Sequence, residues 1–131
     1  MSTDPTRWLA IVNPAAGRPD GGALWRATER TLRSAGIGLD VEHTSHPGHG
    51  ETLAREALQK GRRRLVVAGG DGSVNEVVQG VMTAGLADTR EVTLALAPHG
   101  TGNDWARSLG IPTDPRGVAA MVAAARTRLH D

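Results

Sequence analysis

Cysteine is absent from the 131 residues, which excludes disulfide bonds, thiolate metal sites and thiol nucleophiles. Phenylalanine and tyrosine are absent too, and aromatic residues, all of them tryptophan, make up 2% of the chain. The core must therefore be aliphatic, and the chain lacks the stacking platform that single-strand nucleic-acid binders use. The 15 basic and 14 acidic residues give a net charge of +1, too small to attract nucleic acid by general electrostatics. We expect no nucleic-acid partner.

Long hydrophobic runs are also missing. The longest, residues 119–125, is far shorter than the roughly 20 residues of a membrane-spanning helix. The apolar run at residues 8–12 is too short for a signal-peptide core and ends at Asn13 and Pro14. These features and the lack of cysteine predict a cytoplasmic protein, and the length predicts one domain over residues 1–131.

Short apolar runs alternate with segments of helical periodicity. The runs predict strands at residues 7–12, 65–68 and 92–97, and the alternating segment at residues 39–44 predicts a further strand. Apolar residues at helical spacing predict five helices, around residues 24–35, 53–60, 74–82, 104–109 and 115–129. This alternation indicates right-handed crossovers between parallel strands, with helices on both faces of the sheet. The predicted fold is a small doubly wound α/β domain.

The third predicted helix begins near Ser73, because Ser73 and Glu76 fit the S-x-x-E capping box. Its apolar face would carry four valines and Met82. For Glu76 the alternative to capping is a ligand contact, and Asn75 could be either a ligand or a solvated amide. In the last helix, Asp114 is the expected N-cap and Pro115 the first helical residue.

Two basic patterns have ordinary explanations. The run from Arg62 to Arg64 precedes a predicted buried strand and is expected to be a solvated turn, with contact to anionic lipid headgroups as the alternative. His43, His46 and His49 are spaced by threes, but they cross from a strand into a loop containing proline and glycine. Structural or solvent roles are therefore favoured over a metal site for these histidines.

Three polar, glycine-containing loops follow predicted strands, at residues 13–17, 69–73 and 98–103. In doubly wound sheets, ligands bind beyond the carboxyl ends of the strands, at the first turns of the following helices. The coincidence of the three loops at this edge is the main functional signal in the sequence.

The central loop has glycines on both sides of Asp71. Glycine lets the backbone approach phosphate oxygens closely, and the following helix directs free amides and a partial positive charge at them. Asp71 would repel phosphate unless a cation intervened, so Mg²⁺ is expected beside it. The alternative is a tight turn in which Asp71 only caps the helix.

The other two loops are weaker signals. Gly100 and Gly102 flank Thr101 and would expose its hydroxyl and amide to a ligand, although a glycine turn with Asn103 as helix cap has the same composition. Asn13 and Pro14 could simply end the first strand.

The segments GGDGSVNEVVQG and PHGTGNDWARSLGIP make the sequence resemble the diacylglycerol kinase catalytic domain family, especially bacterial lipid kinases related to sphingosine and ceramide kinases. The opening VNPAAG and a T-x3-G-H-G segment at residues 44–50 extend the resemblance over nearly the whole chain. Ser73 stands where the family usually has threonine and keeps the hydroxyl group.

The resemblance implies ATP and Mg²⁺ as cofactors, phosphoryl transfer to a lipid hydroxyl such as that of diacylglycerol, and peripheral contact with the membrane surface. It implies that Asp71 is catalytic and helps to position the metal. The nucleotide contacts implied for the first two loops are Asn13, Pro14, Ala15, Ala16, Gly17 and Thr44. Those implied for the later loops are Gly69, Gly70, Asp71, Gly72, Ser73, Val74, Asn75, Glu76, Gly100, Thr101, Gly102 and Asn103.

Family members of this type also have a second, β-rich domain that supplies the general base, further metal ligands and much of the lipid cleft. We therefore expect residues 1–131 to be the nucleotide-binding domain, with the second domain outside this chain. An NAD kinase-like or phosphofructokinase-like enzyme would share GGDG but not PxGTGND. A nucleotide-binding module without turnover is a further alternative. The sequence carries no signal for oligomeric state.

Overall fold

The computed structural model describes residues 4–16, 21–98, 104–112 and 114–124. Its sheet has four strands: β1 (Trp8–Val12), β2 (Leu39–His43), β3 (Arg64–Gly69) and β4 (Thr93–Pro98). Their order is β2-β1-β3-β4 and all neighbours are parallel. The α/β fold with a parallel sheet is confirmed.

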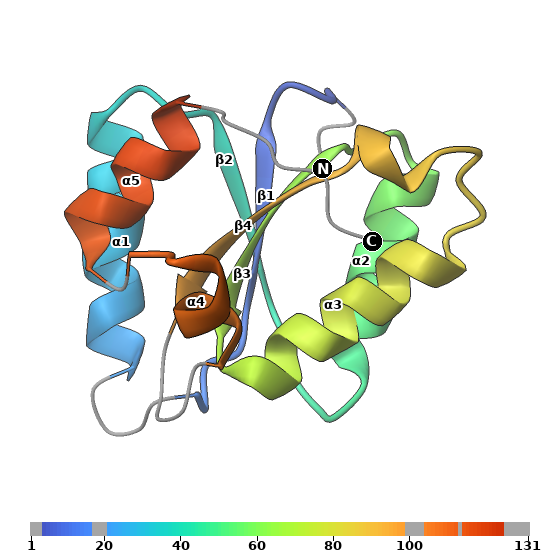
Figure 1. The fold of residues 1–131 in the computed structure, drawn as a ribbon, viewed down its shortest axis with the longest axis horizontal. Coiled ribbons are helices and arrows are strands. Elements are labelled where there is room, and N and C mark those ends of the chain that lie inside the picture. Colours follow the sequence, from blue (N-terminus) through green and yellow to red (C-terminus); the bar gives the residue numbers. More distant parts are fainter. Residues whose placement is uncertain (1–3, 17–20, 99–103, 113, 125–131) are drawn as a thin grey trace.

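The helices form a layer on each side of the sheet (Figure 1). On one side lie α1 (Gly21–Ser34) and α5 (Pro115–Ala124), and on the other lie α2 (His49–Gln59) and α3 (Asp71–Thr83). The short helices η1 (Thr89–Glu91) and α4 (Asp104–Leu109) flank β4 in the chain. Among the described residues, no helix combines the length and apolar character needed to cross a bilayer.

The central strands β1 and β3 are buried on both faces, which explains why they appear in the sequence as unbroken apolar runs. The edge strand β2 is buried only at Leu39. Side chains alternate along β1: Trp8, Ala10 and Val12 pack under α1 and α5, whereas Leu9 and Ile11 pack under α2 and α3. Each side of the sheet therefore has its own apolar core. The core under α2 and α3 is aliphatic as predicted, but the core under α1 and α5 includes the buried rings of Trp8 and Trp25, so the prediction of an aliphatic core is wrong for that side.

Within the described ranges, the helices bury most of the apolar positions that their periodicity predicts. In α3, Val74, Val77 and Val81 are buried, but Met82 is 66% exposed. The prediction that Met82 belongs to the buried face is wrong, because a helix turns about 100° per residue and Met82 is rotated by that angle from Val81. In α5, Asp114 caps the helix as predicted, since its Oδ2 accepts the amide of Gly117 at 3.0 Å.

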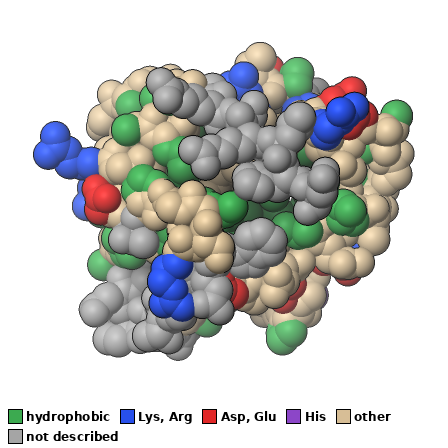
Figure 2. Space-filling model, viewed as in Figure 1, with side chains coloured by type: hydrophobic (Ala, Val, Ile, Leu, Met, Phe, Trp, Pro, Cys, Tyr) green, Lys and Arg blue, Asp and Glu red, His purple; other side chains and the backbone are tan. Residues whose placement is uncertain are grey.

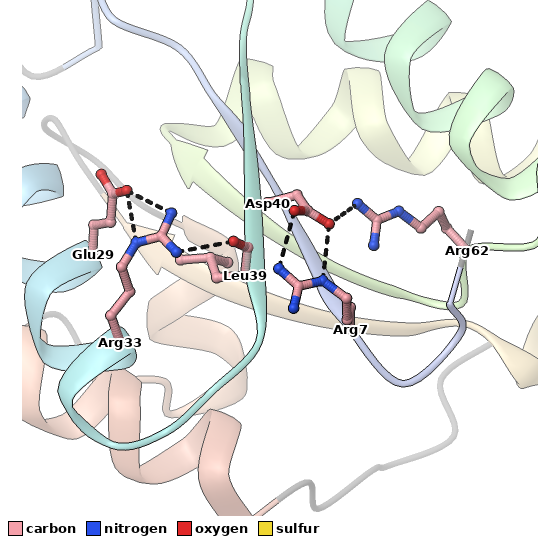
Figure 3. Close-up of polar contacts among 6 residues, drawn as sticks. All are labelled: Arg7, Glu29, Arg33, Leu39, Asp40 and Arg62. Atoms are coloured by element: carbon pink, nitrogen blue, oxygen red, sulfur yellow. Dashed lines mark hydrogen bonds and ion pairs between the residues drawn. The ribbon is translucent and has the colours of Figure 1, made fainter. Parts of the chain in front are cut away.

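A cluster of charges lies at the amino ends of β1, β2 and β3 (Figure 3). The Asp40 carboxylate accepts hydrogen bonds from Arg7, at 3.0 and 3.2 Å, and from Nη2 of Arg62, at 2.6 Å. These guanidinium groups, that of Arg7 first, hold the pKa of Asp40 below its usual value. The Arg62 side chain is completely buried, so the prediction of a solvated turn is wrong for Arg62. Its charge is paired inside the fold instead.

Candidate functional site

The carboxyl ends of β1, β2 and β3 meet at one edge of the sheet, as parallel pairing requires. The first segment at this edge is the turn after β1. There the Asn13 side chain accepts the amide of Ala15 at 3.0 Å, and its backbone carbonyl accepts the amide of Ala16 at 3.2 Å. These bonds give residues 13–16 a defined turn before any ligand binds.

The second segment is the junction of β3 and α3, which lies against Asn13. Ser73 packs on Gly69 so closely that a Cβ built on Gly69 would lie 2.6 Å from the Ser73 Cβ. Asn13 Nδ2 donates a hydrogen bond to Ser73 Oγ at 3.4 Å. Gly69 is therefore required by packing between strand and helix, and Ser73 links this junction to the end of β1.

Helix α3 begins earlier than the capping box predicts. Gly70 is its N-cap, no side chain caps it, and the amide of Val74 bonds the carbonyl of Gly70 at 3.1 Å. The amides of Gly72 and Ser73 therefore lie in the first turn and have no acceptor within the helix. Asp71 is the first helical residue, and a Cβ on Gly72 would meet no atom within 4 Å. The helix thus presents backbone amides and one carboxylate at the edge where the strands end.

The third segment is the loop between β2 and α2, residues 44–50. The amide of Thr44 bonds the carbonyl of Val12 at 2.8 Å, which holds the start of the loop beside β1. Within the loop, His49 Nδ1 accepts the amide of Ser45 at 2.9 Å, and the rings of His46 and His49 stack with centroids 4.6 Å apart. Structural contacts of His49 thus shape this loop.

Glu76 joins this loop to α3. Its Oε2 accepts the amide of Gly48 at 3.1 Å and its Oε1 accepts the amide of Gly50 at 3.0 Å. Its carboxylate therefore does not close a capping box with Ser73, and that prediction is wrong. A Cβ on Gly50 would lie 2.9 Å from Oε1, so the contact also requires glycine at position 50.

These three segments surround a cavity of about 450 Å³. Six of the predicted site residues line it: Asn13, Pro14, Ala15, Thr44, Ser73 and Glu76. Five further lining residues were not predicted: Ile11, Ser45, His46, Pro47 and Gly50. The signal that could have identified most of them is the T-x3-G-H-G segment, which was interpreted only through Thr44.

The remaining predicted residues fall into three groups. Five do not line the cavity but adjoin residues that do: Ala16 in the turn after β1, Gly69 at the end of β3, and Gly70, Asp71 and Gly72 at the start of α3. The Val74 side chain lies in the core under the sheet, and Asn75 is exposed on α3. Five predicted residues lie outside the described part of the chain: Gly17, Gly100, Thr101, Gly102 and Asn103. The strand that leads into the last four ends beside the site, because Pro98 pairs with Gly69.

Over the described ranges, no three His, Cys, Asp or Glu side chains are grouped so that they could hold a metal ion by themselves. Nucleotide-bound Mg²⁺ does not need such a group, since it takes one or two carboxylates together with phosphate oxygens and water. Asp71, partly exposed at the start of α3, carries a carboxylate that could supply an oxygen ligand of that kind. The donor set therefore fits Mg²⁺ that arrives with a polyphosphate.

Comparison with known proteins gives a consistent family. The family model described as "Diacylglycerol kinase catalytic domain" matches residues 7–131. A protein of Chromohalobacter salexigens named "Probable lipid kinase YegS-like" is 38% identical over 112 residues, which are 86% of this chain and 34% of that protein. A protein of the same name from Stenotrophomonas maltophilia is 36% identical over 126 residues, 95% of this chain and 40% of that protein.

The fold is similar to that of solved structures as well. The crystal structure of a diacylglycerol kinase from Bacillus anthracis has a TM-score of 0.78 and 30% sequence identity, and the match covers 92% of this chain and 40% of that one. This chain thus spans between a third and two fifths of the length of these relatives. The match over nearly all of its residues shows that the chain belongs to the diacylglycerol kinase catalytic domain family.

Proposed function

We propose that this chain binds ATP with Mg²⁺ and is the nucleotide-binding part of a lipid kinase that phosphorylates a lipid hydroxyl such as that of diacylglycerol. The observation that carries the proposal is the convergence on one cavity of the turn after β1, the loop after β2 and the first turns of α3, which follows β3. Its volume of about 450 Å³ lies within the range of roughly 300–1,000 Å³ that is usual for small-molecule sites.

The proposed roles follow from the chemistry of each group. The first-turn amides of α3 would bind phosphate oxygens, because a helix N-terminus carries free N–H donors and a partial positive charge. Asp71 would hold Mg²⁺, which when bound neutralises phosphate charge. Asn13, Thr44 and Ser73 would orient the nucleotide from the cavity wall. Phosphoryl transfer depends chiefly on such positioning and charge neutralisation.

The lipid part of the proposal rests on the family and on the names of the relatives. A kinase that uses cytoplasmic ATP and a membrane lipid would be cytoplasmic with peripheral contact at the membrane surface. Among the described residues on the face drawn in Figure 2, the Lys and Arg side chains lie apart from one another and form no broad basic surface.

The first experiment is a calorimetric titration of the chain with MgATP. Asp71→Asn should weaken binding by about tenfold or more, equivalent to about 1.4 kcal/mol, because it removes the metal-binding charge while keeping the side-chain volume. The matched control is Asp88→Asn. Asp88 is the N-cap of η1, which precedes the amino end of β4, whereas the site lies at the carboxyl ends of the strands. Asparagine is an equally good N-cap.

Unchanged MgATP affinity in Asp71→Asn, with normal binding by the control, would contradict the role of Asp71. The acceptor is tested separately with the full gene product and labelled ATP, offering diacylglycerol, sphingosine, NAD and fructose 6-phosphate. Transfer to a lipid supports the proposal. Transfer to NAD or the sugar phosphate supports another kinase class, and MgATP binding without transfer supports a binding module.

A further inference from the structure

We propose that Glu76 is a positioning residue, which links α3 to residues 44–50 and thereby sets the shape and affinity of the nucleotide cavity. This inference deepens the proposed function and rests on it. In this role Glu76 acts by holding the backbone amides of Gly48 and Gly50, and it does not contact the nucleotide directly.

The geometry of the carboxylate supports this role. Both oxygens are engaged, each by a different amide: Oε2 by Gly48 at 3.1 Å and Oε1 by Gly50 at 3.0 Å. Hydrogen bonds to an ionised acceptor are roughly twice as strong as neutral ones. The two amides also lie at the start of α2, where the helix dipole favours negative charge. The Glu76 carboxylate therefore binds two backbone amides at the start of α2.

Among the described residues, the other hydrogen bonds and ring contacts of the loop join it to itself or to β1. The bond from Ser45 to His49 and the stacking of His46 on His49 both connect the loop with itself. The bond from Thr44 to Val12 holds only its first residue, beside β1. The contacts of Glu76 thus connect the end of the loop to α3.

The link spans the cavity wall. Thr44, His46 and Gly50 line it from the loop, whereas Ser73 and Glu76 line it from α3. Without the Glu76 contacts, the cavity would keep the same lining side chains. The nucleotide would then have to order residues 44–50 when it binds. Because a ligand loses affinity when it must order its own site, loss of the link should weaken binding.

Amide hydrogen exchange measured by NMR on the nucleotide-free chain tests the link itself. In Glu76→Ala the amides of Gly48 and Gly50 should exchange about tenfold faster or more, while those of β3 keep their protection. Glu76→Gln should be intermediate, since glutamine keeps one acceptor oxygen. The control is Glu56→Ala, which removes an exposed carboxylate from α2.

A double-mutant cycle tests the effect on affinity. Glu76→Ala should weaken MgATP binding about fivefold or more, and so should Gly50→Ala, because the added methyl group displaces the Glu76 carboxylate without removing it. The double variant should bind no more weakly than either single variant. Asp71→Asn should lower affinity without changing the exchange of Gly48 and Gly50.

Three results would overturn the inference: unchanged protection of both amides in Glu76→Ala, losses of affinity that add in the double variant, or a gain of affinity in Glu76→Ala. Additive losses would mean direct contact with the nucleotide, and a gain would mean that Glu76 competes with it for the amides. If the wild-type chain fails to bind MgATP, the proposed function and the affinity effect both fail. Faster exchange of Gly48 and Gly50 would then still establish the structural link.

Discussion

Asp40 illustrates at the scale of single residues how a charge pattern can be misinterpreted without tertiary contacts. Three consecutive arginines suggest a solvated turn, but Arg62 is buried and bonds Asp40, 22 residues earlier in the chain. Nε and Nη1 of Arg62 have no hydrogen-bond partner. Its burial is therefore tolerable only because one carboxylate lies against Nη2.

We predict that Asp40→Asn lowers the free energy of unfolding by about 2–3 kcal/mol, because it leaves the Arg62 guanidinium buried without a counter-charge. Chemical denaturation at pH 7 measures the loss. The matched control is Glu29→Gln, which breaks the more exposed pair with Arg33 seen in Figure 3 and should cost less than about 0.5 kcal/mol. Equal losses in both variants would contradict the assigned role of Arg62.

The same residue predicts a pH dependence. Arg7 and Arg62 lower the pKa of Asp40 in the folded state, so its stabilising contribution is complete above the unfolded pKa of about 3.9. The contribution is lost as the pH falls through the lower, folded value. The stability difference between wild type and Asp40→Asn should therefore shrink below about pH 4 and stay constant from pH 5 to 7.

At the scale of elements, α3 carries two glycines with opposite surroundings. A Cβ on Gly72 would point into open space beside the site. A Cβ on Gly80 would lie 2.5 Å from the backbone oxygen of Glu51 and 2.8 Å from the Cβ of Ala54, where α3 crosses α2. Gly80 is thus needed for the close packing of two helices, and packing does not require Gly72.

We predict that Gly80→Ala destabilises the chain by about 1–3 kcal/mol through overpacking. Gly72→Ala should leave stability unchanged or raise it by up to about 1 kcal/mol, since alanine is the better helix former. Denaturant unfolding of both variants tests this. Gly72→Ala should nevertheless weaken MgATP binding if the phosphates approach the first turn of α3. A stable Gly72→Ala variant with normal MgATP affinity would show that the phosphates do not approach the first turn of α3.

At the scale of the whole molecule, parallel strand order brings distant segments to one edge of the sheet. Residues at the end of β1, after β2, and on α3, which follows β3, are far apart in the chain but line one cavity. A ligand bound there contacts several elements at once. It should therefore stabilise the whole fold and not one loop alone.

We predict that MgATP at about 100 times its dissociation constant stabilises the chain by about 2.7 kcal/mol and raises the thermal midpoint by about 8–10 °C. Thermal denaturation followed by circular dichroism measures the shift. ATP with a chelator in place of Mg²⁺ should give a much smaller rise. The same rise with and without Mg²⁺ would count against a metal bridge at Asp71.

The order of strands and helices could be predicted from the sequence because each element buries a continuous apolar run or a periodic face. Strands β1 and β3 were predicted to within one residue at each end. The alternation of elements also implies a parallel sheet, and hence that the loops after successive strands converge. For that reason the sequence predicts that Asn13 and Ser73 are neighbours, whereas a place for Thr44 at the site was implied only by the family resemblance.

The partners of Glu76 and Arg62 were decided only by the tertiary structure. Glu76 fits a local capping box, but the amides that it binds lie 26 and 28 residues away, on another helix. Local periodicity defines which face of an element is apolar, because that depends on neighbours in the chain. It does not define which polar groups meet across two packed helices, because that depends on the distance and angle at which the helices cross.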